Sequence, residues 1–199
     1  MKKELDKLKH ARSVKQFPSI DLEDNEYVVL HIKRARVGIV FIWTMVGVLI
    51  FGLSIALIAI AHSSFADTTM FVINEDSLHY LRLAILALYA VIVFAGFVGQ
   101  SIYDQNEMFI TNLRAIQKQR TSLFANSTNI IKLSRIEDVS YRQNSFMEHI
   151  FSIGTLRMST VGDETTYTFP WLATPQDEVK TISHLVAENH HGGAKSDSK

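Results

Sequence analysis

Two long stretches of this chain contain no charged side chain, and they limit its possible folds more than any other feature. They are residues 37–61 and 83–103. A helix over the first stretch, rising about 1.5 Å per residue, would span roughly 37 Å, enough to cross a hydrocarbon core about 30 Å thick. The apolar residues cover every helical face, and a chain of 199 residues is too short to bury two such helices in a soluble core. We therefore predict two transmembrane helices.

A cleaved signal peptide does not explain the first stretch. Its apolar region would begin near the N-terminus and span about 7–15 residues. Here 36 largely polar residues come first, and the uncharged run has 25 residues.

The basic residues around the two stretches predict the orientation in the membrane. Lys and Arg resist translocation, so the segments rich in them stay on the cytoplasmic side. The connecting loop between 62 and 80 has acidic residues but no Lys or Arg. Basic residues instead precede the first stretch and follow the second: Lys33, Arg34, Arg36, Arg114, Lys118 and Arg120. A single Arg82 near the loop can reach the interface by snorkelling. We expect a multi-pass cell-membrane protein with a short external loop, 62–82, and both termini in the cytoplasm.

Composition and motifs leave little room for chemistry. The chain has 20 basic and 20 acidic residues, so it lacks the basic excess of a nucleic-acid binder, and it has no cysteine. No nucleophile elbow, phosphate loop or zinc-binding helix motif occurs. The adjacent pairs Glu148–His149 and His190–His191 lack the partners that a catalytic or metal site needs. We expect no catalytic residue, metal or cofactor, and no enzyme activity.

Short runs suited to strands follow residue 103 and predict a cytoplasmic domain over residues 104–189. Polar and apolar residues alternate in several runs, which is typical of a sheet with one buried and one solvated face. The expected strands are 108–111, 115–120, 130–133, 136–141, 155–161 and 166–171, with turns at 126–129 and at Gly162–Asp163. In the last strand Tyr167, Phe169 and Trp171 should point to one side.

Helical segments complete the prediction. Thr174 and Pro175 favour the start of a helix with one apolar stripe, which should cover the sheet: Val179, Ile182, Leu185 and Val186. Residues 145–151 would form a short helical turn that plugs the barrel. Residues 190–199 lack apolar residues and predict a disordered tail. At the other end, residues 1–36 form a cytoplasmic arm with a weakly amphipathic helix and a strand at 27–32.

Several local motifs resemble the bacterial membrane-attached pleckstrin-homology-like family, over roughly residues 20–187. They are Thr111–Ile116, Ile131–Val139, Ile150–Leu156 and Pro175 at the start of a helix, all after a pair of membrane helices. The acidic segment Leu22–Glu26 also resembles the start of such proteins. Two glycines expected in the family are Ser122 and Ser152 here. The resemblance implies a membrane α-helical hairpin plus an α+β domain, a pleckstrin-homology-like β-barrel or sandwich of about 6–7 strands capped by a C-terminal helix.

The resemblance implies a non-enzymatic module for protein–protein contact at the cytoplasmic face of the bacterial membrane, with membrane lipids and a homo- or hetero-oligomer of membrane proteins as partners. Two alternatives stay open: a sensor of anionic lipid headgroups, and a subunit of a membrane enzyme or transporter. Arg114, Lys118 and Arg120 are the candidate headgroup contacts, because alternate residues of a strand share one face. A solvated strand face explains the same three charges.

Overall fold

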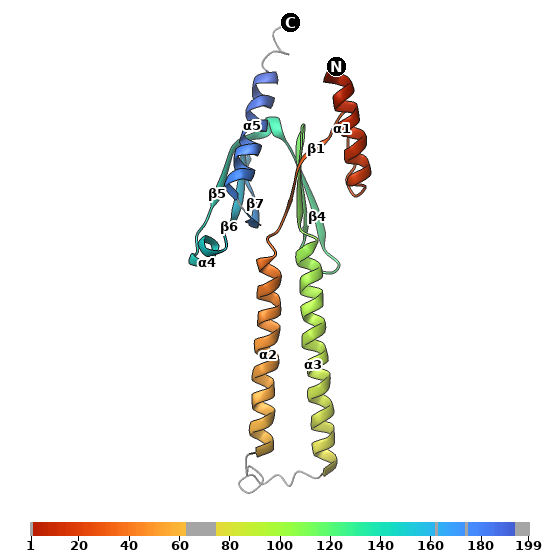
Figure 1. Cartoon of the computed structure of the whole chain (residues 1–199), viewed down its shortest axis with the longest axis vertical. Coiled ribbons are helices and arrows are strands. Elements are labelled where there is room, and N and C mark those ends of the chain that lie inside the picture. Colours follow the sequence, from red (N-terminus) through yellow and green to blue (C-terminus); the bar gives the residue numbers. More distant parts are fainter. Residues whose placement is uncertain (1, 63–74, 162, 174, 194–199) are drawn as a thin grey trace. The chain divides into compact units, whose positions relative to one another are not determined.

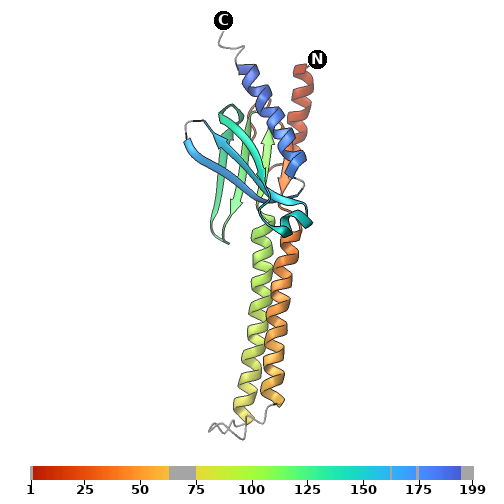
Figure 2. The same ribbon diagram turned by 90° about the vertical axis from the view of Figure 1, so that its left-hand side faces the viewer.

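The computed structural model describes residues 2–62, 75–161, 163–173 and 175–193. These residues divide into two compact units (Figures 1 and 2). The helix unit is Arg36–Tyr103, and the strand unit joins Met1–Ala35 to Asp104–Lys199. Residues from both ends of the sequence therefore build the strand unit, which the sequence analysis divided into an N-terminal arm and a separate domain.

The helix unit contains α2 (Val37–His62) and α3 (Glu75–Asp104). Val37–Ile58 and His79–Asp104 are long and apolar enough to cross a membrane, judged by length and composition. Two hydrogen bonds of 2.8 Å join the helices, from the Trp43 indole to the Gln100 side chain and between the hydroxyls of Ser54 and Tyr89. Polar side chains that bond across helices stabilise helix pairs in an apolar solvent.

Small residues let the two helices approach each other. A Cβ added to Gly38 would collide with the Tyr103 ring, and one added to Gly96 would lie 2.9 Å from the Val46 side chain. By contrast, Gly47 and Gly52 face open space. Glycine therefore serves helix packing at some positions of these helices but not at others.

The strand unit contains two antiparallel sheets. In the first sheet the order is β1 (Val28–Lys33), β2 (Glu107–Thr111), β3 (Arg114–Arg120) and β4 (Asn126–Lys132). In the second it is β5 (Ile136–Arg142), β6 (Ile153–Thr160) and β7 (Asp163–Ala173). A 3-10 turn at Leu133–Arg135 links β4 to β5. At the other corner Ala35, just after β1, donates a backbone hydrogen bond to Trp171 of β7.

The core lies between the sheets and under the last helix, α5 (Pro175–Gly193). Leu156 and Met158 are fully buried, and Ile182 and Val186 contribute the helix's side of the core. The alternation in β6 and the apolar stripe of α5 thus have the predicted roles. Because α5 ends at Gly193, residues 190–193 of the expected tail are helical instead, and 194–199 lie outside the described residues.

Two details of the strands differ from the prediction. The expected turn at 126–129 is instead the start of β4, whose residues pair without interruption with β3. In β7 the pairing shifts between Leu172 and Phe169, and Trp171 has a φ of 64°. This bulge turns the Trp171 side chain away from Phe169 and places Leu172 in the core. The predicted turn at Gly162 and the Thr174 cap fall on residues outside the described ones.

The N-terminal segment covers the outer face of the first sheet. Helix α1 (Lys2–Gln16) leads into Phe17, whose ring meets Phe109 and His31 edge to face. Phe109 is therefore fully buried although its neighbours Met108 and Ile110 point into the core on the opposite face. A strand covered on both faces reads as a continuous buried run rather than an alternating one.

Candidate interaction surfaces

The three basic residues predicted as headgroup contacts lie along β3, and each bonds to its own chain. Arg114 pairs with Glu26 and Glu23. Lys118 donates to the Ser19 carbonyl and lies 5.9 Å from the centre of the Phe109 ring. The Arg120 guanidinium donates to the Gln105 side chain and to the carbonyls of residues 122 and 123. Contact of these residues with lipid stays a prediction.

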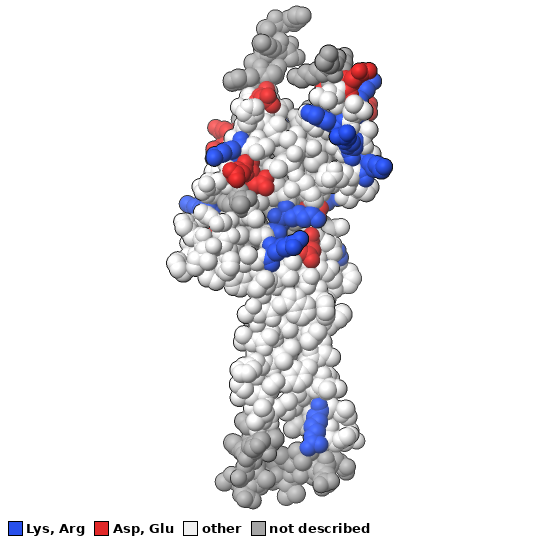
Figure 3. Space-filling model, viewed as in Figure 1, with Lys and Arg blue, Asp and Glu red and all other residues white. Residues whose placement is uncertain are grey.

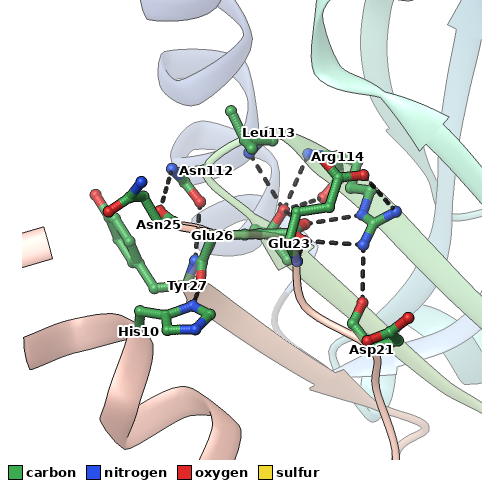
Figure 4. Close-up of polar contacts among 10 residues, drawn as sticks. His10, Asp21, Glu23, Asn25, Glu26, Tyr27, Asn112, Leu113 and Arg114 are labelled. Atoms are coloured by element: carbon green, nitrogen blue, oxygen red, sulfur yellow. Dashed lines mark hydrogen bonds and ion pairs between the residues drawn. The ribbon is translucent and has the colours of Figure 1, made fainter. Parts of the chain in front are cut away.

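Glu26 and Arg114 form a buried ion pair that attaches the N-terminal segment to the hairpin of β2 and β3 (Figure 4). Both carboxylate oxygens of the fully buried Glu26 accept from Arg114, at 2.9 Å each. One oxygen also accepts from the Thr111 hydroxyl at 2.7 Å, and the other from the Glu23 amide at 2.8 Å. A buried charge needs an opposite charge and hydrogen bonds to its remaining polar atoms. The bidentate guanidinium–carboxylate contact and the further hydrogen bonds provide both.

These bonds change the protonation of both groups. Burial alone would raise the pKa of the Glu26 carboxyl, but the hydrogen bonds from Arg114, Thr111 and the Glu23 amide outweigh it and lower the pKa. The hydrogen bond to Glu26 raises the pKa of Arg114. Sequence analysis missed Glu26, because 88 residues separate the partners. The acidic run at 22–26 was the signal that could have pointed to it.

Lys118 and Arg120 also line a polar groove at the end of β3. Its volume is about 320 Å³, and it is lined by Ser19, Gln105, Lys118, Gln119, Arg120, Asn126, Ser127 and Thr128. These lining residues include neither a carboxylate nor an imidazole, so the groove offers two cations and several hydroxyl and amide groups. Such a set suits an anion and provides no general acid–base pair.

The short helix α4 (Phe146–Ile150) forms as predicted at 145–151, but it does not plug the barrel. Ser145 and Glu148 cap it with a reciprocal capping box. Phe146 and Ile150 are 79% and 56% exposed, so the helix presents apolar side chains to the outside. Ile153, just beyond α4, is buried instead. The Glu148 carboxylate accepts the backbone amides of residues 144 and 145, and therefore serves the cap.

The residue before β6 explains a departure from the family's motif. Ser152 has a φ of 50°, in the left-handed region that glycine adopts at least cost. The glycine expected there suits this conformation, and Ser152 adopts it with some strain. Ser122, the other departure, accepts hydrogen bonds from the amides of Phe124 and Ala125 and shapes its turn with its hydroxyl.

Strand β4 leaves one edge of the first sheet without a strand partner in the part of the chain that the structure describes. It pairs with β3 over seven consecutive residues and contains no proline or bulge. Ile130, in its second half, is exposed. The corresponding edge strand of the second sheet, β5, packs against α5, and the His190 ring lies 3.1 Å from the Ile136 carbonyl.

Metal-binding groups do not gather in the described residues, where no three His, Cys, Asp or Glu side chains lie close enough to hold an ion. His190 and His191, the adjacent pair of the sequence analysis, follow each other in α5.

Comparisons with known proteins bear on the family of this chain. A solved structure with similarity to the chain is a DUF1696 family protein with a pleckstrin-homology domain from Shewanella loihica PV-4, at 15% identity and a TM-score of 0.32, covering 43% of this chain and 70% of that one. No curated protein matches. The family model of the bacterial PH domain matches residues 27–188, which include β1, both apolar helices and the strands from β2 to β7. This protein therefore belongs to the bacterial PH domain family.

Proposed function

We propose that this protein is a non-enzymatic PH-like module, anchored in the bacterial cell membrane by α2 and α3, that binds a protein partner at the cytoplasmic face. The open edge of β4 carries the proposal. A protein segment that adds a strand to such an edge gains main-chain hydrogen bonds, and its side chains gain specificity from neighbouring surfaces. The partner is a second copy of this chain or another membrane protein.

Membrane anchoring is supported by the surface of the helix unit. On the face shown in Figure 3 the helices are white over most of their length, without Lys, Arg, Asp or Glu. A groove of about 480 Å³ between them has an apolar lining that includes Phe41, Met45, Leu49 and Val91. Side chains of this kind, exposed on a helix pair, are favourable in hydrocarbon and costly in water. The basic residues beside both helices favour a cytoplasmic position for the strand unit.

The properties of β4 favour a strand-adding partner over a solvated edge. Natural proteins block free edges with proline, bulges, charges or a covering element. In β4 the single charged residue is Lys132 at its end. Because seven successive pairs hold it to β3 without a bulge, its outer backbone groups have the regular spacing that a second strand needs.

Site-specific crosslinking in native membranes tests the edge. The chain has no cysteine, so a single Ser127→Cys places a photoactivatable label on β4 alone. Ser140→Cys on β5 is the matched control, since both serines are exposed on edge strands. We expect a protein adduct from position 127 and not from 140, with Ile130→Lys reducing its yield. Equal labelling from both positions would disprove the strand-addition proposal.

A second candidate function is binding of anionic headgroups in the polar groove, which the pair Lys118 and Arg120 favours. In nanodiscs, phosphatidylglycerol should slow hydrogen exchange of the backbone at 119–127 relative to phosphatidylcholine. Lys118→Gln with Arg120→Gln should remove the difference, and Lys132→Gln, at the other end of β4, should keep it. A difference that survives the double substitution would exclude the groove as the headgroup site.

A further inference from the structure

The end of the strand unit at which the chain connects to α2 and α3 carries a distinctive set of side chains. In the antiparallel register Lys33, the last residue of β1, lies opposite Glu107, the first residue of β2. The chain leaves the unit after Ala35 and returns at Asp104, so both connections lie at this end. We refer to it as the connection end.

Helix α4 lies at the connection end. The backbone of Arg34 forms an isolated antiparallel β-bridge with Leu172 of β7, and Leu172 pairs with Gly154 at the start of β6. Only residues 151 and 152 separate α4 from β6. The loop between β3 and β4, residues 121–125, lies at this end as well, because Lys118 near the end of β3 pairs with Glu107.

Both segments expose large apolar side chains. Phe124 in the loop is 96% exposed, and Phe146 in α4 is 79% exposed. Among the described residues of the strand unit these are the two most exposed large apolar side chains, and they come from separate sheets. Ile150 adds to the apolar surface of α4. Two independent parts of the unit therefore expose aromatic rings at one end.

Two arginines beside these rings suit a negatively charged surface. Arg120 lies beside the loop and holds it through the carbonyls of Ser122 and Leu123. Arg142 is exposed just before α4. The acid of α4, Glu148, is bound by backbone amides in the capping box, which offsets part of its charge. Aromatic and aliphatic side chains flanked by arginine are the composition of segments that bind the membrane interface.

We propose that the loop 121–125 and α4 insert their apolar side chains into the interfacial layer of the bilayer that holds α2 and α3. The proposal rests on the membrane anchoring described above. Because the chain reaches α2 only two residues after Ala35, the connection end starts within a few residues of the bilayer. Phe124 and Phe146 would lie about 5–10 Å into the boundary between headgroups and acyl chains, as do other interfacial segments. The two segments would fix the strand unit against the membrane at two points besides its connections.

Single-cysteine labelling of the full chain tests this contact. Phe124→Cys and Phe146→Cys carry a polarity-sensitive fluorophore, and Val161→Cys is the control. Val161 is 59% exposed and follows Thr160, at the opposite end of β6 from α4. The vesicles contain phosphatidylcholine, phosphatidylglycerol and a lipid with a nitroxide high on its acyl chain. We expect several-fold stronger nitroxide quenching at 124 and 146 than at 161.

A second variant tests the cause of the quenching. With the fluorophore on Ile150→Cys in a Trp43→Phe background, the substitution Phe146→Asp should remove most of the quenching. Trp171 fluorescence, measured before labelling, reports whether the strand unit is still folded. Quenching at 124 and 146 no stronger than at 161 would overturn the proposal. Protection from aqueous iodide without nitroxide quenching would mean that protein rather than lipid covers this surface, and would overturn the proposal too.

The experiment separates this inference from the anchoring on which it rests. Membrane anchoring predicts that the chain stays with the vesicles through an alkaline carbonate wash. Loss of the chain in the wash would refute both proposals. Retention with weak quenching at 124 and 146 would refute only the insertion of the loop and α4.

Discussion

The helix unit and the strand unit keep their apolar side chains in opposite places. In α3, Leu86 and Phe94 are each 68% exposed, and only 6% of the most apolar window of either helix is buried. In the strand unit Leu156 and Met158 are fully buried, and the buried groups even include an ion pair. The first unit leaves much of its apolar surface exposed, which water disfavours, and the second makes its own apolar interior. The same residue types therefore have different energetic roles in one chain.

The two tryptophans allow each unit to be followed separately, because Trp43 lies in α2 and Trp171 in β7. In a Trp43→Phe background, Trp171 fluorescence reports unfolding of the strand unit of the full chain in detergent. In a Trp171→Phe background, Trp43 reports the helix unit.

The largest effect should come from breaking the buried ion pair. Glu26→Ala leaves Arg114 without its partner and should lower the free energy of unfolding of the strand unit by about 3–5 kcal/mol. Glu23→Ala removes the exposed partner of the same arginine, and should cost less than about 1 kcal/mol. Denaturant titration followed by Trp171 measures both. Similar losses from the two variants would show that burial of Glu26 is not what matters.

The core of the strand unit should be nearly as sensitive, whereas the helix surface should not. Leu156→Ala should cost about 2–5 kcal/mol, since it leaves a cavity between the sheets. Leu86→Ala on α3 should change the stability reported by Trp43 by no more than about 0.5 kcal/mol. A large loss from Leu86→Ala would mean that protein rather than lipid or detergent covers this face.

The short helix α4 offers an intermediate test, as it is held by its cap more than by burial. Ser145→Ala should cost about 1 kcal/mol, because the amide of Glu148 loses its acceptor. Ser140→Ala, on the exposed side of β5, is the control and should have little effect. Hydrogen exchange at residues 146–150 is the direct measurement, and unchanged exchange in Ser145→Ala would contradict the role of the cap.

The smallest effects concern pH, where two glutamates should act in opposite directions. The pKa of Glu26 is lowered in the folded protein, so its contribution is present above the unfolded pKa and is lost as pH falls through the folded pKa. Burial raises the pKa of Glu178 in α5, with the Asp177 charge adding to it. Its ionisation therefore opposes folding, and this cost appears as pH rises through the unfolded pKa. Glu178→Gln should raise stability at neutral pH by about 0.5 kcal/mol and lose the advantage in acid. Equal gains at both pH values would point to another cause.

Local patterns in the sequence predict much of the strand unit. Alternation in β6 identifies Leu156 and Met158 as core, and the stripe on α5 identifies Ile182 and Val186. Patterns fail where a distant segment changes the environment. Phe109 lies on the face opposite the core and is buried there under the Phe17 ring, from a distant segment, and the stacked His31 ring. Trp171 leaves the alternating pattern because of a bulge that no local signal marked.

The candidate surfaces also combine features that local patterns predict with features that depend on distant segments. The basic residues of β3 are visible in the sequence, but the partner that holds Arg114 comes from a segment 88 residues away. The apolar residues of α4 read as core in the sequence, because hydrophobicity alone does not distinguish a plug from an exposed surface. Their exposure depends on how the two sheets close.

The sequence by itself determined that two long stretches suit hydrocarbon, because length and lack of charge are properties of a segment and need no partner. It also determined which alternating residues favour a sheet. The tertiary structure alone decided that residues 28–33 pair with β2, which follows both apolar helices in the sequence. It also decided that Glu26 is buried against Arg114 and that Phe124 and Phe146 share one end of the strand unit. These features depend on contacts between residues far apart in the chain, and the free energy of such contacts is set by geometry that only the folded chain provides.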